Sequence, residues 1–343
     1  MPSDRTMVTE LSTALGMLGR ETVNESMKSK PAALSSLSDD TWCALGCAKD
    51  EGEHEDLFSA GFGNGRAFLE APEALRGRVP RIVEWTGGRR PPGYEVVPSD
   101  LRIDHVYLVS CKYVSQILHN ASPARLVDAL LTNLPVDDTT DWYERTAPLE
   151  YQSLYERCTK ETDVEGLPDN AHELDRVTRR RLALALRNGW PPSAEEAYAD
   201  LCDVVSKMTA SLWKKRLDAE GGIGVREAML WRLLRIGSAP YFVLGADVRG
   251  SMRLRVDTPW DWRQQFRLRA FDVVAQEGGQ PRVSWFAFFE NLASGTVGQV
   301  HGHVELRWSH GRFGQRPEAK VYLDVDHCNV PGYHSLGTEG APL

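Results

Sequence analysis

The chain has 343 residues, 42% of them hydrophobic and 26% charged, which is typical of a globular protein, and no apolar run approaches the ~20 residues of a membrane helix. A net charge of −8 argues against a protein whose overall field attracts nucleic acid, although basic strips occur along the chain. The six cysteines form no Cys-x-x-Cys pair and no secretory signal is evident, so we expect reduced thiols and a cytoplasmic location.

The first part of the chain alternates between helical and extended patterns. Glycines at 61, 63 and 65 obscure the start of one helix, and Ser122 followed by Pro123 is a typical helix start. The expected elements are helices over 8–18 and 57–75, strands over 81–85, 94–97 and 103–113, and a helix over 123–134. This order indicates an α/β unit.

The second part of the chain is first helical and then β-rich. We expect helices over 174–187, 193–217 and 225–234, followed by strands over 241–244, 252–256, 266–274, 282–289, 303–308 and 319–325. The predicted fold class is therefore mixed α+β. The predicted segments are an N-terminal extension (1–56), an α/β core (57–135), a linker and helical region (136–238) and a C-terminal antiparallel β domain (239–343).

Candidate chemistry is concentrated in the segment 100–112. Asp100 and Asp104 stand at the entry to an apolar, β-branched run, and Lys112 ends that run. Side chains two apart in a strand share a face, so Ser110 and Lys112 point the same way. A lysine at the end of an apolar strand lowers stability unless it has an acidic partner or a task.

The path of the backbone decides which aspartate can act with Lys112. On one straight strand, eight residues would separate Asp104 from Lys112 by about 26 Å. A hairpin folded near Asp104 and His105 would instead bring Asp100 opposite the Ser110–Lys112 end. Asp100 is therefore the expected first carboxylate, and Asp104 is the alternative if the chain bends sharply beside it.

Two carboxylates and a lysine suit metal-dependent hydrolysis of a phosphodiester. Carboxylate oxygens are ligands for hard divalent cations such as Mg²⁺ (or Mn²⁺). The metal polarises the phosphate and lowers the pKa of a bound water, and the lysine orients that water or stabilises the developing charge.

With these residues the chain resembles the PD-(D/E)XK nuclease superfamily, which includes many restriction endonucleases. Pro98-Ser99-Asp100 and Ile103-Asp104 are similar to the first half of its motif, and Ser110-Cys111-Lys112 to the second. The resemblance covers about residues 57–134. It implies a restriction-endonuclease-like core, Mg²⁺-dependent DNA cleavage, and a place in a bacterial restriction or defence system with a partner protein. Double-strand cleavage would imply a homodimer.

One position departs from the family pattern, because Ser110 stands where the second acid is expected. Some relatives with serine there recruit an acid from elsewhere, typically a helix. The candidates here are Glu70 on the upstream helix, Asp128 on the downstream helix and Glu84 on the preceding strand. The serine and the acidic pI also leave open a catalytically degenerate adaptor that binds nucleic acid or a partner protein.

Two pairs of arginines are candidates for contacts with nucleic acid. Arg89 and Arg90 lie in a predicted loop, and Arg312 and Arg316 lie in a glycine-rich turn of the tryptophan-rich C-terminal part. Arginines beside aromatic residues can clamp phosphates and stack on bases. The alternative for each pair is an ordinary solvated surface.

Overall fold

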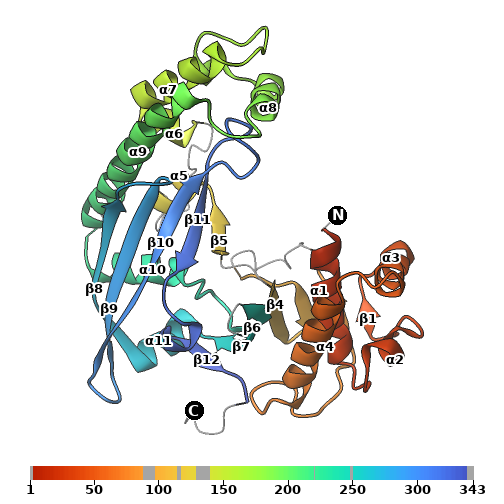
Figure 1. Cartoon of the computed structure of the whole chain (residues 1–343). Helices are drawn as coiled ribbons and strands as arrows, with labels where there is room; N and C mark the ends of the chain where they lie inside the picture. Colours follow the sequence, from red (N-terminus) through yellow and green to blue (C-terminus); the bar gives the residue numbers. More distant parts are fainter. Residues whose placement is uncertain are drawn as a thin grey trace. The chain divides into compact units, whose positions relative to one another are not determined.

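The computed structural model describes residues 3–87, 97–113, 117–128, 140–219, 221–247 and 250–337. The chain folds into two compact units (Figure 1). Unit 1 combines 1–116, 235–265 and 327–343, and unit 2 combines 117–234 and 266–326. Helices and two separate sheets occur together, so the predicted mixed α+β class is confirmed.

Unit 1 is built on a mixed sheet that has seven strands among the described residues. In spatial order these are β1 (Leu34–Ser35), β2 (Val83–Trp85), β3 (Leu101–Ile103), β4 (Tyr107–Tyr113), β6 (Tyr241–Asp247), β7 (Gly250–Val256) and β12 (Tyr333–Ser335). Strand β3 pairs antiparallel with both β2 and β4, whereas β4 and β6 pair in parallel. A parallel pair requires a crossover, and here the crossover contains most of unit 2.

Two helices, α1 (Asp4–Gly16) and α4 (Glu55–Glu70), cover one face of this sheet (Figure 1). Their apolar side chains form a core with Val83, Val109 and Phe242 of the strands. The other helical segments of unit 1 are α2 (Val23–Met27), α3 (Asp39–Asp50), α11 (Pro259–Gln265) and η2 (His327–Asn329).

Two of the three glycines that obscure α4 in the sequence, Gly61 and Gly65, allow it to approach α1 closely. A Cβ atom on Gly65 would lie 2.1 Å from the carbonyl oxygen of Thr13, and one on Gly16 would lie 2.1 Å from that of Phe62. Both distances are far inside van der Waals contact. Gly16 and Gly65 therefore let the backbones of α1 and α4 come into direct contact.

The strand expected over 103–113 is interrupted by a turn at residues 104–106, and the chain takes the hairpin path that was the alternative to one straight strand. Asp104 and His105 have φ angles of 50° and 60°, and the chain reverses at these residues. Leu101 pairs with Val109, and the Asp100 amide donates to the Val109 carbonyl at 2.8 Å. The hairpin therefore brings Asp100 beside the Ser110–Lys112 end of β4.

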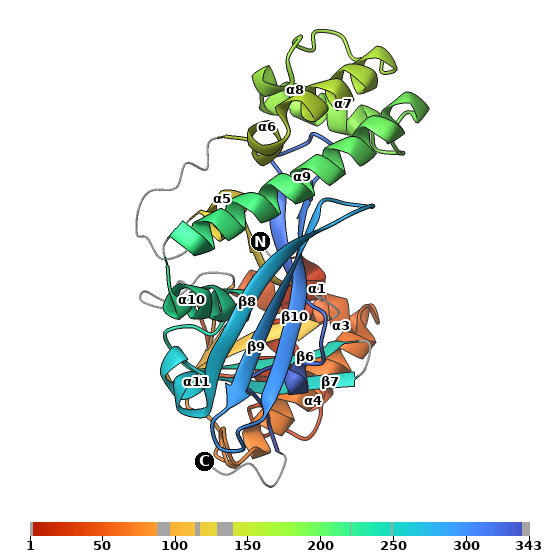
Figure 2. The same ribbon diagram turned by 90° about the vertical axis from the view of Figure 1, so that its left-hand side faces the viewer.

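Unit 2 contains an antiparallel sheet. Its strands in spatial order are β5 (Ile117–Ala121), β11 (Glu318–Leu323), β10 (Val297–Arg307), β9 (Arg282–Asn291) and β8 (Phe266–Gln276). The long helix α9 (Pro192–Ala219) packs across this sheet (Figure 2). The remaining helical segments are α5 (Pro123–Val127), α6 (Trp142–Thr146), α7 (Pro148–Lys160), η1 (Ala171–Glu173), α8 (Arg176–Ala185) and α10 (Ile223–Leu233).

Most of the helices and strands expected from the sequence are found in the structure, but the grouping of the strands differs. Strands β6 and β7 join the sheet of unit 1 instead of pairing with β8 to β11. Unit 1 thus draws on the expected N-terminal extension, α/β core and C-terminal part together. The expected strand at 94–97 lies, except for Val97, outside the described residues, as does the end of the helix expected over 123–134.

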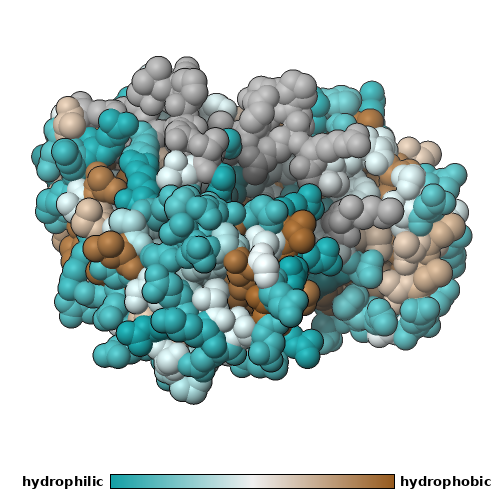
Figure 3. All heavy atoms as spheres, turned by 90° about the horizontal axis from the view of Figure 1, so that it is seen from above, coloured by the Kyte–Doolittle hydropathy of each residue, from teal (hydrophilic) through white to brown (hydrophobic). Residues whose placement is uncertain are grey.

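The face of the molecule seen in Figure 3 is mostly hydrophilic, with small groups of hydrophobic residues between the polar ones. Within the described ranges, none of the helices is both long enough and apolar enough to cross a membrane.

Candidate functional site

The open end of the β3–β4 hairpin holds the carboxylate of Asp100 in place. Its Oδ2 atom accepts a hydrogen bond from the backbone amide of Cys111 at 2.6 Å and another from the Ser110 hydroxyl at 3.2 Å. Ser110 is almost fully buried, with 1% of its surface exposed. The serine that replaces the expected second acid therefore orients the first one.

A second carboxylate reaches this site from α1. Glu10 is only 6% exposed, and its Oε2 atom accepts a hydrogen bond from Trp85 Nε1 at 2.5 Å. Burial, together with the negative charge of Asp100, raises the pKa of Glu10 to about 8. Glu10 thus occupies a position where a second negative charge is costly unless a cation is present.

Sequence reasoning expected an acid from a helix but did not find Glu10. A signal was available, because Glu10 lies between Val8 and Leu11 in a helix whose buried face is otherwise made of apolar and small side chains. A carboxylate buried in such a helix needs a partner or a function. The sequence pattern does not place this signal at the site, because the segment 1–56 is expected to be an extension outside the core.

Lys112 lies on β4, and the charges of both acids act on its pKa. Burial lowers the pKa of Lys112, Asp100 opposes that effect, and the positive charge of Arg235 adds to it. Within the described part of the chain, the ammonium makes no hydrogen bond or ion pair. Strand β6 comes so close at this point that a Cβ atom on Gly245 would lie 1.7 Å from the Lys112 carbonyl oxygen. The backbone of Lys112 is therefore tightly held while its side chain stays available.

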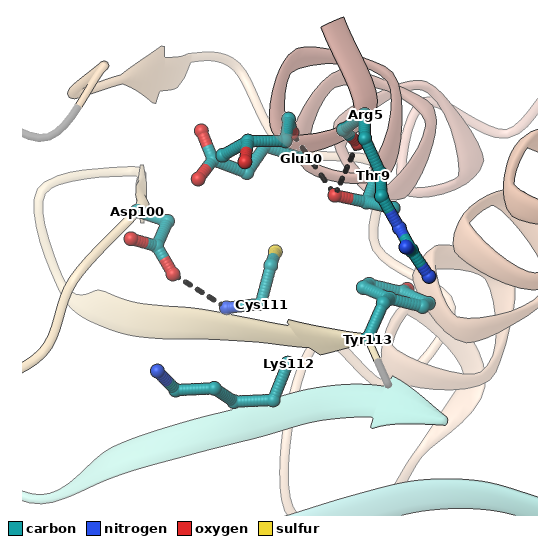
Figure 4. A pocket seen from close by; sticks show the side chains of 8 residues that line it. Arg5, Thr9, Glu10, Asp100, Cys111, Lys112 and Tyr113 are labelled. Carbon is teal, nitrogen blue, oxygen red and sulfur yellow. Dashed lines mark hydrogen bonds between the residues drawn. The ribbon is translucent and has the colours of Figure 1, made fainter. Parts of the chain in front are cut away.

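These groups line a cavity of about 250 Å³. Its walls are formed by Arg5, Thr6, Thr9, Glu10, Asp100, Cys111, Lys112 and Tyr113. In Figure 4 the carboxyl groups of Glu10 and Asp100 lie above strand β4, whereas the amino group of Lys112 lies below it. The exposed Arg5 adds a second cationic group to the wall of the cavity.

The two remaining titratable groups of the cavity have structural roles. Burial, and then the charges of Asp100 and Glu10, raise the pKa of Cys111, so its thiol stays protonated and is a poor nucleophile. The hydroxyl of Tyr113 is hydrogen-bonded to Thr13 at 2.9 Å and to Asn64 Nδ2 at 3.0 Å. This network ties the end of β4 to both helices above the sheet.

Asp104, the alternative first carboxylate, lies at the turn of the hairpin and not in the cavity. It accepts hydrogen bonds from the backbone amides of Arg81 and Ile82 at 2.8 and 3.0 Å, and from Arg78 Nη1 at 2.6 Å. Burial opposes its ionisation, but these donors outweigh burial and lower the pKa of Asp104. Its contacts are those of a turn residue.

The other predicted acids are also placed away from the cavity walls. Glu70 is exposed at the end of α4, with Arg66 3.4 Å away. Glu84 projects from β2 on the face opposite to its neighbour Trp85, toward Arg102. Asp128 belongs to unit 2, where it forms an ion pair with Arg145 at 2.5 Å.

The predicted nucleic-acid contacts fall outside this cavity. Arg89 and Arg90 lie outside the described residues. Arg312 and Arg316 belong to unit 2, where Arg316 is exposed. The guanidinium of Arg312 donates to the Leu186 carbonyl at 2.7 Å, so part of its hydrogen-bonding capacity is already used within the fold.

The donor set of the cavity fits a hard cation that keeps part of its water shell. Mg²⁺ is commonly bound through one or two carboxylates together with waters and substrate phosphates. Glu10 and Asp100 supply two carboxylates, and no group of three or more histidine, cysteine or acidic side chains suited to a metal occurs among the described residues. Positive charge there would also offset the repulsion that raises the pKa of Glu10.

Comparisons of this chain with protein-family models, curated proteins and solved structures found no match. The function is therefore argued from the geometry of the cavity and from the resemblance carried by residues 98–112.

Proposed function

We propose that unit 1 contains a Mg²⁺-dependent (or Mn²⁺-dependent) nuclease centre that hydrolyses phosphodiester bonds of DNA. One observation carries the proposal: Glu10 and Asp100, from separate elements, line one cavity together with Lys112, whose ammonium has no partner among the described residues. The resemblance to PD-(D/E)XK nucleases supports DNA as the substrate. It also supports action in the cytoplasm within a bacterial restriction or defence system, with a partner protein.

Each residue of the cavity has a separate task in this proposal. Asp100 and Glu10 hold the metal ion, and Ser110, the Cys111 amide and Trp85 fix the orientation of their carboxylates. A bound Mg²⁺ would polarise the phosphate and lower the pKa of a water molecule. Lys112 donates hydrogen bonds to the attacking water or to the phosphate oxygens, where negative charge develops.

The lowered pKa of Lys112 fits this task. Burial makes its charged form less stable than in water, so the ammonium gains more from a nearby anion than a solvated lysine does. Arg5 on the cavity wall is placed to meet a phosphate of the substrate. Cleavage of both strands by one such centre per chain requires two copies, so a homodimer is part of the proposal.

The test is cleavage of supercoiled plasmid by the full chain in Mg²⁺, in Mn²⁺ and in EDTA. Lys112→Ala should lower the rate about 100-fold or more, because it removes the group that stabilises developing charge. Lys28→Ala is the matched control, since Lys28 is an exposed lysine of the same unit away from the cavity. Metal-dependent cleavage that is equal in both variants contradicts the proposal.

A catalytically inactive adaptor is the second candidate. It is favoured by Ser110, which gives the site one carboxylate fewer on the strands than the family pattern has. An adaptor would bind DNA in EDTA in a salt-sensitive manner and would not cleave it under any metal condition. That result would replace the nuclease proposal, and binding of neither DNA nor metal would point to a protein partner.

A further inference from the structure

A second cavity, of about 550 Å³, lies in unit 2 between α8 and the turn that joins β10 to β11. Its walls carry Arg176, Arg180 and Arg187 from α8 and the residues just after it, and His310 and Arg312 from the turn. No aspartate or glutamate lines it. In a chain with a net charge of −8, this is a local concentration of positive charge.

The turn that forms one wall of this arginine cavity is held by several contacts. Arg312 donates to the Leu186 carbonyl at 2.7 Å, and its guanidinium lies 4.9 Å from the centre of the Trp190 ring. The next residue, Phe313, is fully buried and stacks on Tyr151 at 5.6 Å. These contacts fix the turn against α8, so the shape of the cavity is formed before any ligand arrives.

The arginines on α8 are not neutralised within the fold. Arg176, Arg180 and Arg187 are exposed, and none of them forms an ion pair within the described part of the chain. Arg179, on the same helix, shows the contrast, because it pairs with the buried Asp141 at 3.2 Å. Like charges four residues apart, as at 176 and 180, destabilise a helix by a few tenths of a kcal/mol. An anion between them would remove that cost.

We propose that the arginine cavity binds the phosphates of a nucleic-acid backbone. The planar guanidinium matches two phosphate oxygens at once, and several arginines on one wall can hold successive phosphates without reading the bases. The choice of nucleic acid over an acidic protein rests on the nuclease function proposed above. The cavity thus supplies sequence-independent affinity from a unit that does not contain the cleavage site.

The experiment measures binding apart from cleavage. A fluorescein-labelled DNA duplex is titrated with the full chain in EDTA, by fluorescence anisotropy, over a range of sodium chloride concentrations. Arg180→Gln should weaken binding several-fold and should reduce the slope of log K against log salt by about 0.9, the value for one lost phosphate contact. The triple variant Arg176→Gln/Arg180→Gln/Arg187→Gln should weaken binding roughly tenfold or more.

Arg181→Gln is the matched control. Arg181 is the next residue on the same exposed helix and carries the same charge, but it does not line the cavity. Circular dichroism confirms that the variants are folded. The proposal is overturned if Arg180→Gln and Arg181→Gln have equal effects, if wild-type protein does not bind the duplex at low salt, or if polyglutamate binds more tightly than DNA in an Arg180-dependent manner.

The two proposals can fail separately. Arg180-dependent binding in EDTA, with no cleavage in Mg²⁺ or Mn²⁺, would uphold the arginine cavity and reject the nuclease centre. Lys112-dependent cleavage, together with DNA binding that Arg180→Gln does not change, would uphold the nuclease centre and reject the arginine cavity.

Discussion

Each end of the β3–β4 hairpin carries an aspartate, but the charged neighbours of the two aspartates differ. At the turn, Asp104 accepts two backbone hydrogen bonds and is paired with the cation of Arg78. At the open end, Asp100 also accepts a backbone hydrogen bond, but its charged neighbours are a second buried acid, Glu10, and an ammonium with which it forms no ion pair. The turn end is electrostatically satisfied and the open end is not.

This difference separates a structural carboxylate from a functional one. A folded chain normally neutralises buried charge, because an unpaired buried charge costs free energy. The turn end follows that rule and needs no ligand. The open end keeps two acidic side chains in one cavity, where the pKa of Glu10 is raised to about 8, and a bound cation would favour the charged form of both.

The largest expected effect is a loss of cleavage, which should occur when Asp100 is substituted but not when Asp104 is. Asp100→Asn keeps the size of the side chain but removes a charge from the proposed metal site, so we expect plasmid cleavage to fall about 100-fold or more. Asp104→Asn removes the same charge from the turn and should leave the rate within about threefold. Initial rates in Mg²⁺ measure both. Equal losses in the two variants would show that the ends of the hairpin are not distinct in function.

The second effect is on stability and is expected at the turn end. Asp104→Ala leaves the amides of Arg81 and Ile82 without their acceptor and Arg78 without its partner. We expect the free energy of unfolding to fall by about 2 kcal/mol, measured by urea denaturation. Exposed Glu70→Ala is the control and should change it by less than about 0.5 kcal/mol. A loss no larger than the control's would mean that the turn does not depend on Asp104.

The third effect is on pH dependence, where the two ends should behave oppositely. The pKa of Glu10 is raised from 4.5 to about 8 in the folded state. The stability linked to Glu10 is therefore present below pH 4.5 and is lost as the pH rises toward 8. The pKa of Asp104 is lowered, so its contribution is present above the unfolded value of 3.8 and is lost at lower pH.

Glu10→Gln tests this directly, because glutamine can still accept the Trp85 hydrogen bond. Near pH 8 the variant should be more stable than the wild type by about 2 kcal/mol, and the difference should shrink toward pH 5. Adding Mg²⁺ at pH 8 should stabilise the wild type and not the variant. If the wild type and the variant had identical stability between pH 5 and 8, the raised pKa of the buried Glu10 would be contradicted.

The sequence predicted the position of Asp100 beside Ser110, but it did not predict that Glu10 lines the same cavity. The spacing between Asp100 and Lys112, with a turn near Asp104, was enough to predict the hairpin and to choose Asp100, because register follows from strand geometry. The pairing of Leu101 with Val109 puts Asp100 beside Ser110, as that geometry predicts. Local pattern was also sufficient for most helices and strands of both units.

What the sequence did not reveal depends on long-range contacts. Glu10 lies on α1, which packs against α4 at Gly61 and Gly65, more than 40 residues later in the chain. Strands β6 and β7 pair with β4 across the crossover that contains most of unit 2. Periodicity indicates that a strand exists and which face is buried, but it does not indicate the partner of that strand.

The smallest expected effect concerns Ser110. Ser110→Ala removes one hydrogen bond to Asp100 at 3.2 Å, while the shorter bond from the Cys111 amide at 2.6 Å remains. We expect cleavage to fall by roughly threefold and stability by about 1 kcal/mol. Ser99→Ala is the matched control, because the buried Ser99 hydroxyl donates to a backbone carbonyl, that of Leu101, and not to a carboxylate. Ser99→Ala should lower stability as much as Ser110→Ala does and should leave cleavage unchanged. If Ser110→Ala instead abolished cleavage as Asp100→Asn should, Ser110 would act on the metal or substrate itself, and the open end would need no help from Glu10.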